Sequence, residues 1–106
     1  MAQAKRLSVA NDTTPTIGNR SGPSDAIIEI EGTWTGTITF EAKVEDAVLW
    51  FPIGLTPVAG GAVSTTAAAN GIWRTVNGGA SGLEVRGRLS TATSGTAETS
   101  VASADW

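Results

Sequence analysis

The chain has 106 residues, a formal net charge of −3 and a hydrophobic fraction of 41%, and it contains neither Cys nor His. This length suits one domain, and the missing Cys and His exclude disulfides, thiol nucleophiles, the usual zinc sites and the commonest general base near neutral pH, so we expect no enzymatic activity, cofactor or metal. The densest basic cluster is the pair Lys5 and Arg6 and apolar stretches are short, so we expect neither nucleic-acid binding nor insertion into a membrane.

Residues 1–25 form the first segment, which is rich in residues that favour turns. Asn, Asp, Pro, Gly and Ser are frequent in its second half, and these residue types interrupt regular secondary structure. We place short strands near residues 7–10 and 16–17. The segment as a whole is predicted to be an irregular, extended N-terminal arm, separate from a β domain over residues 26–106.

The strongest strand pattern in the chain covers residues 37–44. Apolar and polar side chains alternate there, which is the period of a strand with one buried and one solvated face. An earlier strand is predicted over residues 26–31 for the same reason. Between the two strands, the glycines of residues 32–36 predict a turn or bulge around Trp34.

The middle of the chain combines a dense apolar run with a long stretch of small residues. We interpret residues 48–53 as a strand that is buried on both faces or covered by a neighbour. Pro52 cannot donate to a ladder, which favours an edge or a strand end. Residues 57–71 are predicted to be a long loop with a short strand over residues 62–66. A loop of this length in a compact domain needs a reason, and contact with a partner is one.

Three further strands are predicted over residues 72–76, 83–89 and 96–104. Gly-rich turns separate them, including one at residues 94–95. The total is about seven to eight short strands at regular spacing. This pattern is typical of an all-β fold, and we expect an antiparallel β-sandwich with a jelly-roll-like topology.

Residues 28–41, 70–76 and 83–97 carry a resemblance to a known group of proteins. The first contains Gly32-Thr33-Trp34-Thr35-Gly36-Thr37, the second follows Asn70-Gly71, and the third ends on Thr93-Ser94-Gly95-Thr96-Ala97. Taken in order, they resemble the small β-sandwich proteins of tailed bacteriophage virions, such as head decoration proteins. The chain departs from the usual pattern at Gly87, where a β-branched residue is common. It also has Asp46-Ala47 in place of an Asp-Gly turn.

The resemblance implies a structural protein on the outer surface of a virion. Its most direct form is a capsid decoration (cement) protein that binds the major capsid protein and bridges its subunits. We also expect a homo-oligomer, with a trimer favoured, because extra burial between copies would support a thin core. Two alternatives stay open, namely a carbohydrate-binding module of a phage fibre and a neck, tail or baseplate component.

We expect contacts with partners to come from the arm, the 57–71 loop, exposed Trp side chains and the last residue. Trp34 and Trp73 are also the candidate platforms for a sugar, and packing in the core is the competing interpretation. Trp106 ends the chain and is expected to dock on a neighbouring subunit. The candidate partner-binding residues are Lys5, Arg6, Pro15, Arg20, Trp34, Trp73 and Trp106.

Overall fold

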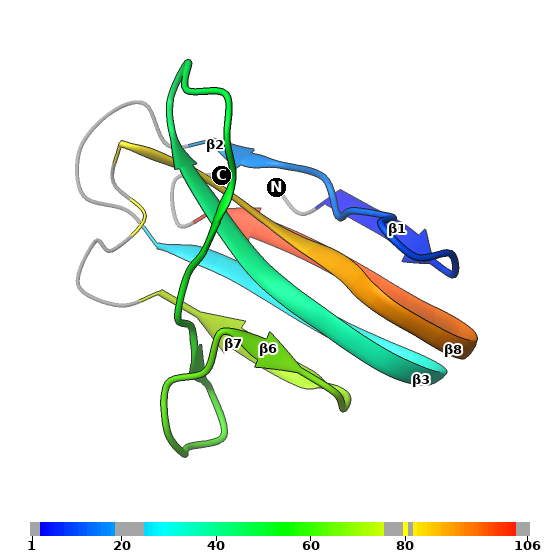
Figure 1. Cartoon of the computed structure of the whole chain (residues 1–106). Helices are drawn as coiled ribbons and strands as arrows, with labels where there is room; N and C mark the ends of the chain where they lie inside the picture. Colours follow the sequence, from blue (N-terminus) through cyan, green and yellow to red (C-terminus); the bar gives the residue numbers. More distant parts are fainter. Residues whose placement is uncertain (1–2, 19–24, 76–79, 81, 104–106) are drawn as a thin grey trace.

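The computed structural model describes residues 3–18, 25–75, 80 and 82–103. In this part of the chain eight strands form one antiparallel sheet and no helix is present, which confirms the predicted all-β fold (Figure 1). The strands are β1 (Gln3–Leu7), β2 (Ile17–Gly18), β3 (Ala26–Val44), β4 (Phe51–Pro52), β5 (Thr56–Pro57), β6 (Thr66–Ala67), β7 (Gly71–Arg74) and β8 (Leu83–Ser103).

Two long strands, β3 and β8, form the centre of the fold. They pair along their whole length, from Ala26 opposite Ser103 to Val44 opposite Leu83. Both strands bend in the middle, where the register shifts, and their second halves return over their first halves (Figure 1). Each of them therefore supplies two of the strands predicted from the alternation of residues, one before the bend and one after it.

The bend folds the single sheet into the two layers of a sandwich. The first layer contains the first half of β3 and the second half of β8, with β1 on one side and β7 and β5 on the other. The second layer contains the other halves of β3 and β8, with β2 and the short strands β4 and β6. The two layers are joined through the long strands at one end of the molecule (Figure 1).

The predicted turns at residues 32–36 and 94–95 lie at this bend. The two strands stay paired through it, with Trp34 opposite Gly95. Gly95 has a φ of +77°, and a Cβ at this position would overlap the carbonyl oxygen of Thr33. Only glycine adopts this backbone conformation at low cost while letting the facing strand approach so closely. The turn-forming residues therefore bend two continuous strands instead of separating shorter ones.

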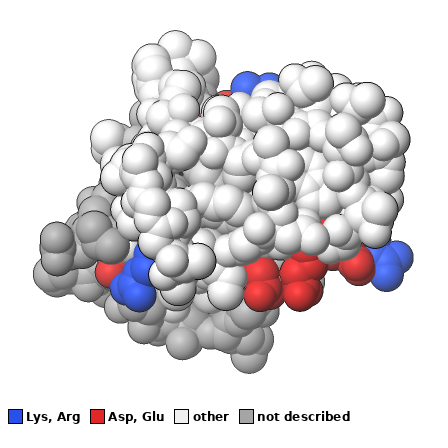
Figure 2. Space-filling view, turned by 90° about the horizontal axis from the view of Figure 1, so that it is seen from below, with Lys and Arg blue, Asp and Glu red and all other residues white. Residues whose placement is uncertain are grey.

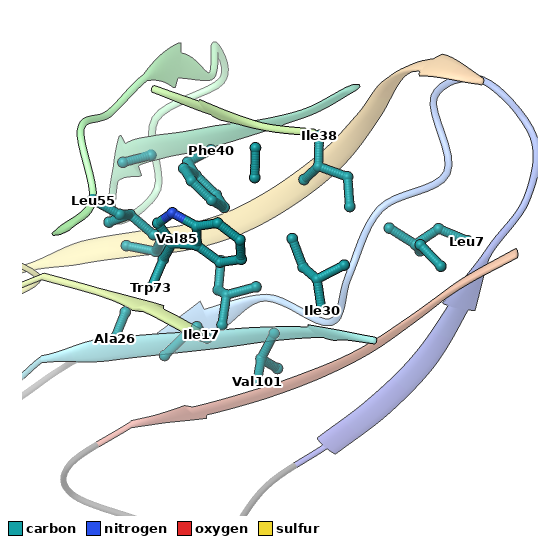
Figure 3. Close-up of a cluster of buried hydrophobic side chains, with 14 of the residues drawn as sticks. Leu7, Ile17, Ala26, Ile30, Ile38, Phe40, Leu55, Trp73, Val85 and Val101 are labelled. Carbon is teal, nitrogen blue, oxygen red and sulfur yellow. The ribbon is translucent and has the colours of Figure 1, made fainter. Parts of the chain in front are cut away.

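The hydrophobic core fills the space between the layers (Figure 3). Ile28 and Ile30 come from the first layer, Ile38 and Phe40 come from the second, and all four side chains are fully buried. The rings of Phe40 and Trp73, which also belong to opposite layers, have centroids 5.7 Å apart. The alternation predicted for residues 37–44 is thus confirmed for Ile38, Phe40 and Ala42. It is wrong at the end of the strand, where Val44 is exposed, and for Glu41, which is buried on the other face.

Gly87 lies on the core side of β8, and the structure explains why a β-branched residue is absent there. A Cβ at this position would lie 3.2 Å from Cγ2 of Ile38 and 3.4 Å from Cγ2 of Thr14. The backbone N–H of Gly87 also donates a 2.9 Å hydrogen bond to Oγ1 of Thr14. The space of a larger side chain is therefore occupied by Ile38 and by Thr14 from the N-terminal segment.

The N-terminal segment is part of the sandwich over residues 3–18. β1 pairs with the second half of β8, and β2 pairs with its first half. Leu7 and Ile17 are fully buried in the core. This segment was expected to be an arm outside the β domain, but its large apolar side chains close one side of the sandwich, and their burial favours ordered strands. Residues 19–24 of the predicted arm lie outside the described residues.

Candidate partner-binding site

Large apolar side chains are exposed together in the segment that joins β3 to β4. Val48 is 86% exposed, Leu49 is 68% exposed, and Val44 and Phe51 are 63% exposed. This segment, residues 44–51, is the green loop that projects at the top of Figure 1, and we call it the apolar loop. Exposed apolar surface that is gathered in one place marks a site for binding a partner.

The apolar loop is held at both ends. Its turn is closed by the N–H of Ala47, which donates to the carbonyl of Val44 over 2.9 Å, and Asp46 within it has a φ of 67°. Nζ of Lys43 donates to the carbonyl of Ala47 over 3.0 Å. At the far end β4 pairs with β3. The loop is therefore tied to the strand from which it leaves.

Trp50 is the large apolar residue of the loop that packs back onto the protein. It is half-buried, and the guanidinium carbon of Arg86 lies 4.0 Å from its ring centroid. Nζ of Lys43 lies 5.5 Å from the same centroid. Cations are attracted to the face of an aromatic ring by its quadrupole. Trp50 thus fixes the loop against the outer face of the second layer, while its neighbours Val48 and Leu49 remain exposed.

A buried carboxylate holds the arginine on which Trp50 packs. The side chain of Glu41 is 7% exposed and accepts hydrogen bonds from Nε of Arg86 at 3.1 Å and from Nε of Arg88 at 2.9 Å. Arg88 also donates to Oδ1 of Asn11 at 2.8 Å. Charge-assisted hydrogen bonds of this kind fix side-chain geometry strongly when they are shielded from water. Glu41, Arg86 and Trp50 together form a bracket beneath the apolar loop.

Burial within this chain, one of the two alternatives expected for residues 48–53, was wrong for Val48, Leu49 and Phe51, and cover by a neighbour stays a prediction. These side chains were expected to be buried or covered by a neighbour, and they are exposed in this chain. An apolar run has the same composition whether its own domain or a partner covers it, so composition did not distinguish the two. The available signal was Pro52, which indicated an edge and is found in the short strand β4.

The small-residue loop predicted over residues 57–71 contains a second exposed pair. Val58 is 54% exposed and Val63 is 65% exposed, while the loop itself is tied down by an isolated bridge between Leu55 and Ser64. In Figure 1 it lies at the end of the view opposite to the apolar loop. The two exposed groups are therefore separate surfaces.

The basic residues predicted in the arm lie on or near an edge of the first layer. Lys5 and Arg6 are exposed on β1, and Nε of Arg6 lies 3.4 Å from Oε1 of Glu98. Pro15 is half-buried beside Thr14 in the segment before β2. None of these three side chains contributes to the bracket beneath the apolar loop. The remaining predicted contacts, Arg20 and Trp106, lie outside the described residues.

Trp34 and Trp73 are engaged in packing and internal hydrogen bonds. Trp73 is 9% exposed and belongs to the core. Trp34 is half-buried at the bend, and its Nε1 donates to Oδ1 of Asn70 at 2.8 Å. Nδ2 of Asn70 in turn donates to the carbonyl of Gly32 at 2.9 Å. An aromatic platform for a sugar needs an open ring face and polar groups free to bind hydroxyls. The ring of Trp73 is buried, and the polar groups beside Trp34 are hydrogen-bonded to one another.

Acidic side chains form a row on the outer face of the first layer. Glu29, Glu31 and Glu98 alternate with buried residues of β3 and β8, and Glu31 lies directly opposite Glu98. Red side chains gather in the lower part of Figure 2, which is consistent with this row. Within the described residues, no group of three or more Asp or Glu side chains is arranged to hold a metal ion, and no helix could cross a membrane.

Comparison with known proteins relates the chain to one solved structure. No protein-family model and no curated protein sequence matches the chain. The chain is similar to the crystal structure of the SPBc2 prophage-derived protein YomS, with a TM-score of 0.69 and 12% sequence identity. The match covers 98% of this chain and 96% of that one. The likeness shows a fold that both chains share over nearly their whole length.

Proposed function

We propose that this chain is a non-catalytic structural protein of a bacteriophage virion, and that it is a capsid decoration protein bound to the outside of the head. The apolar loop carries the proposal, because a rigidly held, exposed apolar surface suits permanent attachment to a larger assembly. The shared fold with a prophage-derived protein supports the phage origin. The resemblance of residues 28–41, 70–76 and 83–97, taken together, to virion proteins also supports it.

In this proposal the protein binds the major capsid protein and bridges its subunits. Full burial of a Val, Leu or Phe side chain contributes about 1.5–3 kcal/mol, so the loop can supply a substantial part of the binding free energy. A protein that binds only the assembled shell stabilises that shell by mass action. A trimer would let copies around a threefold axis bind three sites at once, which raises the avidity for the shell.

Two other functions differ from decoration in ways that can be measured. A neck, tail or baseplate component would use the same fold and the same apolar loop but would be present in few copies. A carbohydrate-binding module is disfavoured by the internal contacts of Trp34 and Trp73. Trp50 is also covered on one face by Arg86.

The experiment is to purify the virus particles produced from the phage genome that encodes this chain. The copy number and the position of the protein in these particles are then measured. We expect hundreds of copies, visible as density on the outer face of the head by cryo-electron microscopy. Particles made without the gene should release their DNA at lower temperature. A copy number of about a dozen, at the neck or tail, would replace decoration with the second function, and absence from the particle would refute a virion role.

A further inference from the structure

The charges around the apolar loop restrict what it can bind. Lys43 pairs with Glu84 at 3.2 Å and also donates to the loop backbone. Arg86 and Arg88 are both paired with the buried Glu41. Asp46, in contrast, is exposed within the loop itself. The loop therefore presents apolar and acidic groups, while the basic side chains named here are engaged beneath it.

Pairing of strand edges is a less suitable route of association for this fold. Within the described residues, the short strands β4 and β5 contain Pro52 and Pro57, which lack the N–H needed to extend a ladder. On β1, an edge strand of the first layer, Lys5 and Arg6 are charged and exposed. Charged side chains and prolines at edges disfavour the addition of a further strand. We therefore expect the protein to associate through exposed side chains. Among the described residues, the apolar loop exposes the largest group of apolar ones.

From these observations we propose that the apolar loop inserts, as a preformed plug, into an apolar cleft of a protein partner whose rim carries Lys or Arg. This inference rests on the proposed function and specifies how the attachment is made. The four exposed side chains present on the order of 300 Å² of apolar surface, compared with roughly 800 Å² per partner in a standard interface. They are therefore the centre of an interface, and polar contacts around Asp46 and the basic rim complete it.

The bracket of Glu41, Arg86 and Trp50 lowers the conformational entropy that the loop loses on binding. Binding a flexible loop costs conformational entropy, which lowers the affinity. Here Trp50 is packed on Arg86, and Arg86 is held by the buried Glu41. The loop is thus ordered before it meets the partner. A charged lipid surface is the weaker alternative, because an acidic loop without free basic side chains is repelled by anionic headgroups.

The test uses particles assembled without the gene, to which purified protein is added and from which free protein is removed by sedimentation. We expect saturable binding of the unchanged protein. The double substitution Val48→Ser with Leu49→Ser should raise the Kd by about 30-fold or more, as at the centre of an interface. The matched control is Val58→Ser with Val63→Ser in the other exposed loop, which should leave the Kd within about 3-fold.

The substitution Asp46→Asn tests the basic rim separately. Asn tolerates the positive φ of this position, so the turn is retained and only the charge is lost. We expect weaker binding at low salt and a shallower dependence of the Kd on salt concentration. An unchanged salt dependence would contradict a basic rim.

The other outcomes distinguish a failure of the proposed function from a failure of the loop to insert. If the unchanged protein does not bind the particles, the proposed function itself fails. If it binds and the Val48→Ser, Leu49→Ser variant binds equally well, decoration stands and the plug is refuted. Vesicles of phosphatidylcholine, alone or with phosphatidylglycerol, should not retain the protein, and loop-dependent retention on them would replace the protein cleft with a lipid surface. Circular dichroism melting of every variant confirms that folding is unchanged.

Discussion

At the scale of single residues, Asp12 shows how one exposed side chain organises the N-terminal segment. Its Oδ2 accepts hydrogen bonds from the backbone N–H groups of Ser8 at 3.0 Å and Val9 at 2.9 Å. These two hydrogen bonds favour the ionised form and lower the pKa of Asp12 below 3.8. The sequence predicts a turn here from residue type, but the backbone partners became known only from the structure.

The lowered pKa of Asp12 leads to a pH-dependent prediction. Its contribution to stability is present above its unfolded pKa and is lost as the pH falls through its lower folded pKa. We therefore expect Asp12→Asn to be less stable than the unchanged protein at neutral pH, with the difference shrinking as the pH falls below the ordinary pKa of an aspartate. Urea unfolding from about pH 2 to pH 7 measures this difference. A difference that stays constant to the lowest pH would contradict the assignment.

At the scale of elements, β3 and β8 show what residue patterns can and cannot predict. The alternation over residues 37–44 correctly places Ile38, Phe40 and Ala42 in the core, but Val44 on the same predicted face is 63% exposed. The same pattern does not distinguish two strands joined by a turn from one strand with a bend, because both bring the same apolar faces together. Pairing of Trp34 with Gly95 decides between them. That pairing depends on two segments that lie far apart in the sequence.

A substitution at the bend tests this arrangement. Gly95→Ala places a Cβ against the carbonyl oxygen of Thr33 at a positive φ, and we expect a loss of about 2 kcal/mol or more in the free energy of unfolding. Gly60→Ala is the matched control, since Gly60 also has a positive φ but nothing lies within 4 Å of its Cβ position. Denaturant unfolding of both variants should show the larger loss at Gly95. Equal losses would mean that close approach of the strands at the bend is not required.

At the scale of the whole molecule, the N-terminal segment completes the sandwich. The N–H of Asn11 donates to the carbonyl of Leu89, and that of Thr14 donates to the carbonyl of Gly87. These hydrogen bonds join residues 11–14 to the edge of the second layer. The segment thus connects β1, in the first layer, to β2, in the second layer. The segment contains few apolar residues, so local patterns indicate an arm, whereas the long-range pairing with β8 orders it.

The burial of Leu7 provides the test of this role. Leu7→Ala should lower the free energy of unfolding by about 2–5 kcal/mol, because it removes buried methyl groups and leaves a cavity. Val9 lies two residues away and is 65% exposed, so Val9→Ala should change stability by less than about 0.5 kcal/mol. Thermal and urea unfolding compare the two variants. A small effect at Leu7 would indicate that the segment is an arm after all.

The sequence alone determined the all-β class, the faces of the strongest strand and the positions where the backbone bends. These follow from the period of apolar residues and from the glycines, which act over short distances along the chain. Only the tertiary structure decided that Val48, Leu49 and Phe51 are exposed. It alone also decided that Trp50 rests on Arg86, which Glu41 holds. Burial depends on which distant segments pack together. Local patterns in the sequence do not indicate that long-range packing.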